Sequence, residues 1–270
     1  MASQIIETPP NPKTWLSALG PSTAGRAQAW TQTHADALLA DVFGYHALQV
    51  GWPELGSLRA NRMPHRWLAT TEFEWPAHVP PDQSGLQAHL WMDSRAWPWP
   101  AESLDLVVLP HTLEQSADPH ACLREVERVL IPEGQLFITG INPWSLWGWR
   151  QSRFVRQQRH TDPDCSAAGL IGCNRLRDWL RLLGFEVQVV RFGGWTPAWQ
   201  SERWHQRWSW LDRIGQRWWP FLGGVYLVVA TKRVPGGRLL TQRQWRKVRS
   251  AAASTVPVAR TDVGGGPPRP

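Results

Sequence analysis

Two apolar runs separated by one amphipathic helix constrain the fold of this chain more than any other feature. The runs cover residues 104–109 and 136–139, and each is typical of a strand that is covered on both faces. Asp118 is placed to cap the intervening helix, Pro119 takes its first position, and Gly134 is expected to follow its end. Because a helical crossover makes the two strands parallel neighbours, we predict an α/β domain.

A dense pattern of residues extends around this unit. It consists of Asp93, the turn 97–100, the run 103–107, His111, Asp118, Pro119, and the run 123–130 followed by Pro132 and Gly134. Together these residues resemble the class I S-adenosylmethionine (SAM)-dependent methyltransferases, specifically the type 11 methyltransferase domain. The resemblance implies a doubly wound, mostly parallel seven-stranded sheet of the Rossmann-like type. It also implies SAM as the cofactor, bound across the carboxyl ends of the first strands, and an acceptor that the sequence does not identify.

The resemblance implies which residues contact the cofactor. In this family an acid at the end of the third strand contacts the adenine amino group, and Asp93 has that position, with the turn around Trp97 closing against the ring. A carboxylate suits this contact because it accepts and the amine donates, although Asp93 could also simply cap the strand. Glu72 or Glu74 follows the predicted strand 65–70 and is the candidate for the ribose hydroxyls; the alternative is a surface carboxylate.

Leu109, Pro110 and His111 end the fourth predicted strand at the edge where the chemistry is expected. Leu109 is expected beside the cofactor. His111 could act as a general base, because the pKa of histidine lies near neutrality. Alternatively, His111 hydrogen-bonds locally and shapes the pocket, since many methyl transfers require little more than in-line alignment.

The first predicted strand ends at Gly51, where the glycine-rich loop of the family should begin. That loop has an acid two residues before its first glycine and two further glycines at alternate positions, so that the backbone can approach the methionine moiety of SAM. The corresponding residues here are Gln49, Gly51, Pro53 and Leu55. Glu54 or Gly56 could partly substitute, or Gly51 could merely end a strand. A catalytically inactive binding or regulatory protein of the same fold is therefore the alternative to an active methyltransferase.

We divide the chain into an irregular lead-in over residues 1–22, a methyltransferase-like domain over 23–233 and a basic, disordered tail over 234–270. The best-matched core covers 86–140. The helix before the third strand is expected to be reduced, because residues 76–85 contain three prolines and a glycine. Further elements are predicted as a helix at 24–41, a loop at 140–148, loop-like residues at 150–172, a helix at 174–183 capped by Asn174, and strands at 185–192 and 223–232.

Twenty tryptophans occur in the chain, and seven of them lie in an insertion at 193–222. Trp204, Trp208, Leu211 and Trp218 share one helical face of this insertion. That face could cover the substrate, pack against the sheet or bind a membrane surface. The loop at 140–148 is expected to line an acceptor pocket or to cap the next helix.

The net charge of +7 is concentrated in the tail. Residues 231–270 hold nine Lys and Arg and one acid, whereas the other 230 residues hold 20 basic and 21 acidic side chains. The tail could therefore contact nucleic acid or anionic lipid. Three cysteines without metal-ligand spacing favour a reducing compartment and no metal. The absence of a signal peptide and of a long apolar segment predicts a cytoplasmic protein with no transmembrane segment.

Overall fold

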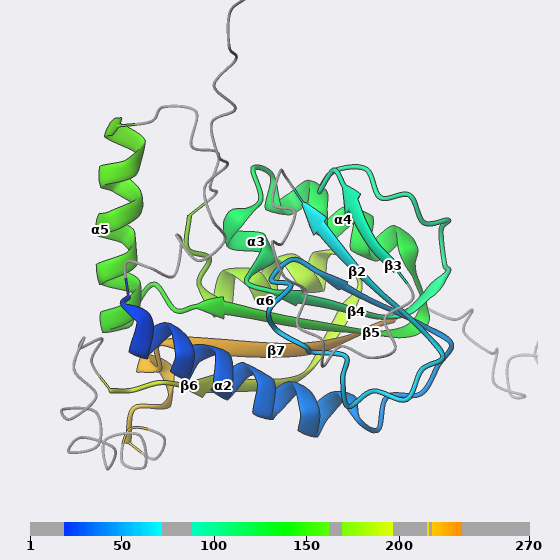
Figure 1. The fold of residues 1–270 in the computed structure, drawn as a ribbon, viewed down its shortest axis with the longest axis horizontal. Helices are drawn as coiled ribbons and strands as arrows, with labels where there is room; N and C mark the ends of the chain where they lie inside the picture. The colour runs from blue at the N-terminus through cyan, green and yellow to red at the C-terminus, as the bar shows by residue number, and fades with distance from the viewer. Residues whose placement is uncertain (1–18, 72–87, 162–168, 197–214, 216–217, 234–270) are drawn as a thin grey trace, which may run out of the picture. The chain divides into compact units, whose positions relative to one another are not determined.

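A computed structural model describes residues 19–71, 88–161, 169–196, 215 and 218–233 (Figure 1). These residues belong to the first of two compact units, Met1–Val234; the second unit is Pro235–Pro270. The predicted tail, the first 18 residues of the lead-in and the proline-rich segment 76–85 lie outside the described residues.

A single seven-stranded sheet organises the described residues, in the order β3-β2-β1-β4-β5-β7-β6. The strands are β1 (His46–Val50), β2 (His65–Thr71), β3 (Ala88–Met92), β4 (Leu104–Pro110), β5 (Leu130–Ile141), β6 (Phe185–Gly193) and β7 (Val225–Lys232). All neighbouring pairs are parallel except those that β7 makes with β5 and β6. The predicted doubly wound, mostly parallel seven-stranded fold is confirmed.

The sheet has a topological switch point between the parallel strands β1 and β4. From β1 the strands proceed outward to β2 and β3, and the chain then returns to place β4 on the other side of β1. Such a switch point is where open α/β sheets bind ligands. We call the edge formed by the carboxyl ends of β1 to β6 the carboxyl edge, and the opposite edge the amino edge. At the amino edge, the Asp105 carboxylate accepts hydrogen bonds from the backbone N–H groups of Tyr45 and His46, joining β1 to β4.

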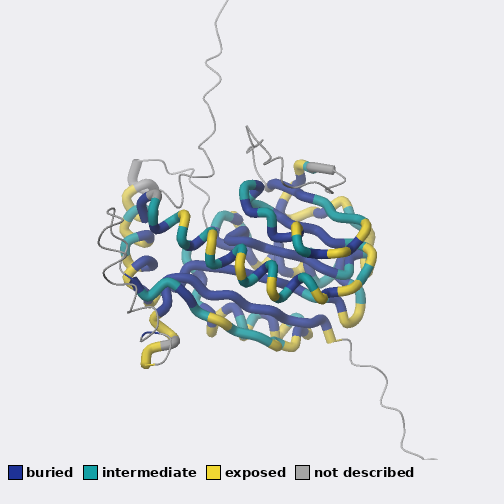
Figure 2. The backbone as a smooth tube through the Cα atoms, turned by 60° about the horizontal axis from the view of Figure 1, so that its bottom comes forward, coloured by how far each residue is buried: buried dark blue, intermediate teal, exposed yellow. Residues whose placement is uncertain are grey.

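Helices cover both faces of this sheet (Figures 1 and 2). Helix α2 (Pro21–Leu39) packs on one face, against a cluster that includes Leu106, Val108 and Phe137. Helices α4 (Pro119–Val129) and α6 (Cys173–Leu182) pack on the other face, against the alternate residues of the same strands. This alternation is why the central strands are apolar throughout.

Helix α4 begins as predicted but ends earlier. Asp118 Oδ1 accepts a hydrogen bond from the backbone N–H of Ala121 at 3.0 Å, and Pro119 takes the first helical position. The prediction that Gly134 follows the helix was wrong, because β5 begins at Leu130, directly after the helix. Leu123, Val126 and Val129 of the predicted helix face are fully buried, as is Leu130, which belongs to β5.

Two predictions about the second half of the chain were wrong. Residues predicted as loop-like form helix α5 (Leu146–Thr161), in which Ser145 Oγ accepts a hydrogen bond from the backbone N–H of Gly148 at 3.0 Å. The helix was missed because its apolar residues lie toward its start, so its sequence lacks a long apolar period. Asn174 does not cap α6; the N-cap is Gly172, without a side-chain hydrogen bond. Two short helices, α3 (Thr112–Gln115) and η1 (Pro220–Leu222), complete the described elements.

Candidate active site

The structure brings most of the predicted cofactor residues to the carboxyl edge. Gly51 follows β1, Asp93 follows β3, and His111 follows β4. Leu109 lies within β4 and is fully buried in the core cluster. Glu72 lies outside the described residues.

Gly51 has the backbone geometry of a tight approach. Its φ is +81°, and a Cβ at this position would lie 2.9 Å from Thr112 Oγ1. The hydroxyl of Thr112 in turn donates a short hydrogen bond to the carbonyl of Val50. Only glycine fits here without strain, because L-residues rarely adopt this φ and the space for a side chain is filled.

Gln49 closes the loop that follows Gly51 on itself. Its side-chain amide donates toward the carbonyls of Gly51 at 3.2 Å, Trp52 at 3.0 Å and Leu55 at 2.7 Å. Its side-chain oxygen accepts from the backbone N–H of Ser57 at 3.1 Å. An uncharged amide in place of the expected acid therefore performs a structural task, because an amide, unlike a carboxylate, both donates to and accepts from this loop.

Glu54 is the acid within this loop, and its carboxylate is incompletely paired. Among the described residues, no group hydrogen-bonds to the buried Oε2 atom of Glu54. The backbone carbonyl of the same residue accepts from the Gln28 side chain on α2 at 3.1 Å, which anchors this part of the loop. A buried carboxylate oxygen without a donor is costly, and a cationic ligand group would remove that cost.

Asp93 presents an accessible acceptor at the end of β3. Its side chain is 48% exposed, and its Oδ1 atom accepts from the backbone N–H of Arg95 at 2.8 Å. That hydrogen bond, and a second from the Arg95 guanidinium, hold the pKa of Asp93 below its ordinary value. Asp93 is thus an ionised acceptor at neutral pH.

The turn after Asp93 is fixed by an ion pair on α4. The Glu125 carboxylate accepts from the backbone N–H of Trp97 at 2.9 Å, and Arg128 donates to the carbonyls of Trp97 and Trp99. The two side chains also bind each other at 2.7 Å. The indole of Trp97 is 5% exposed and packs into the core, so it supports the turn from beneath.

His111 is fully buried and paired with a second buried residue. Its Nδ1 atom lies 3.1 Å from Glu114 Oε2, and the other oxygen of Glu114 accepts from the backbone N–H of Ile141. The His111 ring meets Trp52 edge-on, with ring centroids 5.2 Å apart. His111 also has a left-handed φ of 56°, where β4 gives way to α3. The pair links the ends of β4 and β5 to the loop after β1.

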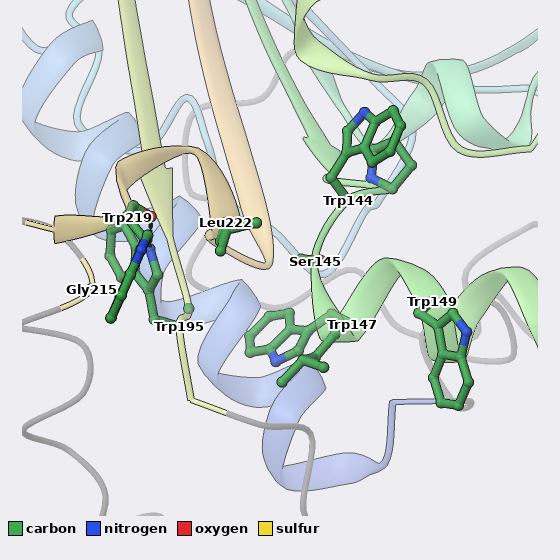
Figure 3. A pocket seen from close by; sticks show the side chains of 11 residues that line it. Trp144, Ser145, Trp147, Trp149, Trp195, Gly215, Trp219 and Leu222 are labelled. Carbon is green, nitrogen blue, oxygen red and sulfur yellow. Dashed lines mark hydrogen bonds between the residues drawn. The ribbon is translucent and has the colours of Figure 1, made fainter.

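A tryptophan-lined cavity lies beside this site at the carboxyl edge (Figure 3). The cavity measures about 770 Å³ and lies where β5 and β6 end and β7 begins. Its walls are mostly apolar and include Trp144, Trp147, Trp149, Trp195, Trp219 and Leu222. Trp147 is anchored there, because its indole N–H donates to the carbonyl of Thr196 at 2.7 Å. The described part of the loop at 140–148 therefore both lines a pocket and caps α5.

Helices on both faces of this sheet, and the switch point between β1 and β4, define a Rossmann-like fold. Residues 81–138 match the family model described as a methyltransferase domain. The chain is 33% identical over 175 residues to the uncharacterized protein YafS of Escherichia coli (strain K12), a match that covers 63% of this chain and 67% of that protein. Residues 81–138 thus form a type 11 methyltransferase domain, and the chain belongs to the same protein family as YafS.

Solved structures share the same fold. One is from the complex between the Haloferax volcanii Trm112 methyltransferase activator and a methyltransferase, with a TM-score of 0.55 and 16% identity over 82% of this chain and 97% of that chain. Another is a SAM-dependent methyltransferase from Thermotoga maritima, with a TM-score of 0.52 and 15% identity over 82% of this chain and 94% of that chain.

Three functional features were missed in the sequence. Gln49 was noted only as a departure from the family pattern, and Glu114 was not singled out. The spacing of Glu114 three residues after His111, at a strand end, was the available signal for that pair. The loop at 140–148 was predicted to line a pocket, but its meeting with Trp195 and Trp219 was missed, because these segments lie up to about 80 residues apart in the sequence.

Metal sites and membrane-spanning helices can be assessed over the described residues only. In this part of the chain, no group of three or more His, Cys, Asp or Glu side chains could hold a metal ion. Among the same residues, no helix has the length and hydropathy needed to cross a membrane. Cys122 and Cys173 are buried free thiols, and burial raises their pKa values to about 12 and about 11.

Proposed function

We propose that the protein transfers a methyl group from SAM to an acceptor held in the tryptophan-lined cavity. The observation that carries the proposal is the placement of Gly51, Asp93 and the cavity along one edge of the sheet. Bound SAM supplies an electrophilic methyl group on a sulfonium, and the protein has to hold that group in line with the acceptor.

The adenosine half of the cofactor fits Asp93 and its turn. Asp93 is ionised, accessible and lacks a hydrogen to donate, which suits the adenine amine. The Glu125 and Arg128 pair holds the adjoining turn in place before any ligand arrives, which lowers the entropy that binding must overcome.

The methionine half fits a different set of residues from the family pattern. Gln49 is committed to the loop, so we assign the acid that faces the ammonium group to Glu54, whose buried Oε2 lacks a hydrogen-bond donor among the described residues. Gly51 lets the backbone approach the ligand. Glu72 remains a proposed ribose contact, and Leu109 contributes to the floor of the site through the core beneath it.

His111 has two proposed roles, and burial favours the positional one. A fully buried ring that is bound to Glu114 and packed by Trp52 stabilises the loop around the cofactor. As a general base, the same ring would need Trp52 to move and admit the acceptor. We therefore propose that alignment by the site, rather than proton removal by His111, is the main source of catalysis.

Titration calorimetry with SAM and with its demethylated product tests this function. We expect both ligands to bind, and Asp93→Asn and Glu54→Gln each to weaken binding by about 1–3 kcal/mol. Asp41→Asn and Glu102→Gln are the matched controls, since both acids are exposed at the amino edge, and they should leave affinity unchanged. No heat and no thermal shift with either ligand would instead support the second candidate, a binding or regulatory protein that retains the fold without catalysis.

A further inference from the structure

Exposed apolar side chains gather around the mouth of the tryptophan cavity. They are Trp144, Leu146, Trp149, Trp219 and Leu222, and Trp144 is 82% exposed. They come from the loop after β5, from α5, and from η1 with the residue that precedes it, and Figure 3 shows the labelled members around the hollow. An apolar patch of this kind at one edge of a soluble fold marks an interaction surface.

A stripe of exposed apolar and cationic side chains on helix α5 continues this patch. Leu146, Trp149, Arg153 and Arg156 are all exposed and follow one another at intervals of three, four and three residues, which places them on one face of the helix. The guanidinium of Arg153 lies 4.3 Å from the centroid of the Trp149 ring. Residues 146–161 contain four arginines and no acid. The stripe is thus apolar at the carboxyl edge and cationic further along α5.

We propose that this face docks on a bilayer that contains anionic lipid. Tryptophan and leucine side chains of the patch enter the interfacial region, where amphipathic aromatic rings are favoured. Arg153 and Arg156 lie further along α5 and remain at the depth of the lipid phosphates. The charge of the stripe and that of the lipid are therefore complementary.

Lipid fits this face better than nucleic acid does. Proteins that bind single strands offer the free faces of aromatic rings to the bases and flank them with cations. Here one face of the Trp149 ring is covered by Arg153, and the apolar end of the stripe, at Leu146, lies with Leu222 in the lining of the cavity. Aliphatic groups beside a mostly apolar cavity match acyl chains more closely than bases.

The orientation of the docked protein also affects which acceptors reach the cavity. If the cavity holds the acceptor, which rests on the function proposed above, docking presents its mouth to molecules dissolved in the bilayer. The docking itself does not depend on catalysis, so the two proposals fail in different experiments.

A fluorophore at a single site distinguishes this face from the basic tail. The full chain carries an environment-sensitive nitrobenzoxadiazole group at Leu146→Cys, in a Cys165→Ser background in which Cys122 and Cys173 are buried. Leu182→Cys is the matched control, because Leu182 is 85% exposed at the end of α6, at the amino edge. Phosphatidylcholine vesicles with phosphatidylglycerol should shift the emission at position 146 to the blue and leave position 182 unchanged. Vesicle binding without that shift would place the contact elsewhere in the chain and overturn the proposal, as would no binding.

Vesicle sedimentation of full-chain variants gives the second readout. One double variant carries Leu146→Ser and Trp149→Ser, and a second carries Arg153→Glu and Arg156→Glu. Each should lower the vesicle partition coefficient at least about tenfold. The control pair Leu182→Ser and Arg181→Glu removes a similar exposed leucine and arginine from the amino edge and should leave the coefficient unchanged.

Salt and RNA complete the test. The difference between the wild type and the Arg153→Glu, Arg156→Glu pair should shrink as salt screens the surface charge. Equal partition of wild type and both α5 pairs would overturn the proposal. Single-stranded RNA that shifts the fluorophore at position 146, where vesicles do not, would overturn it in favour of a nucleic-acid surface.

Discussion

Replacing Gln49 by the acid that the family pattern expects should damage this protein. Gln49 is 2% exposed, and its amide donates toward the carbonyls of Gly51, Trp52 and Leu55. In Gln49→Glu, one carboxylate oxygen still accepts from the backbone N–H of Ser57, while the other has no hydrogen to offer the three carbonyls. The substitution restores the family residue and removes the group that closes this loop.

The magnitude follows from the number of donors lost. The amide of Gln49 has two hydrogens, shared among three buried or partly buried carbonyls. Each buried polar group left without its partner costs about 1–3 kcal/mol, so the loss of two donors should lower the free energy of unfolding by about 2–6 kcal/mol at neutral pH. Binding of SAM should weaken as well, because the loop that includes Glu54 loses its fixed path.

The pH dependence identifies the cause. A buried carboxylate that faces carbonyls has a raised pKa in the folded state, and the unfolded value is about 4.3. The unfolded chain therefore releases its proton first as pH rises, and the deficit of Gln49→Glu grows above about pH 4.3 until the folded-state pKa is passed. Lowering the pH from neutral should consequently bring the stability of the variant closer to that of the wild type.

Denaturant unfolding at several pH values, monitored by circular dichroism, measures this difference. Gln188→Glu is the matched control, because Gln188 is exposed on β6 and the same change should shift stability by less than about 0.5 kcal/mol. A Gln49→Glu protein as stable as the wild type at neutral pH, or one that binds SAM more tightly, would refute the structural role assigned to this glutamine.

Three further predictions concern other residues of the site and core. Gly51→Ala should lower the free energy of unfolding by about 1–3 kcal/mol in a chemical melt, because of its φ of +81° and the threonine hydroxyl at 2.9 Å, and an unchanged melt would contradict this. The hydrogen bond from Arg128 depresses the pKa of Glu125, so Glu125→Gln should cost about 1 kcal/mol above pH 4.3. This difference should vanish as pH falls through the depressed pKa; a difference that persists in acid would exclude the ion pair as its source. In a Cys165→Ser background, Cys122 and Cys173 should not react with Ellman's reagent at pH 8 until the protein unfolds, and rapid labelling of the folded protein would show that their burial is wrong.

The sequence alone determined the central unit of the fold. The apolar runs of β4 and β5 and the capped helix between them depend on contacts within about forty residues, and such local patterns are readable. Asp118 and Pro119 mark the start of α4 because capping is a local interaction. The family pattern around Asp93 and His111 then extended this unit to the full sheet.

Only the tertiary structure decided how the loop after β1 is held and what lies beside it. The amide of Gln49 is explained by carbonyls that face it once the loop has folded, and Glu114 is explained by the approach of β5 to β4. Helix α5 was missed because its exposed stripe has no partner within the described sheet to impose an apolar period on its sequence. The tryptophan cavity joins residues from the loop after β5, from α5, from the residues after β6 and from the segment before β7, and no local pattern records the meeting of all four. Long-range contacts of this kind depend on how the whole chain folds together. The sequence therefore predicted the strands and strand ends that form the site, and only the structure showed which side chains from distant segments line it.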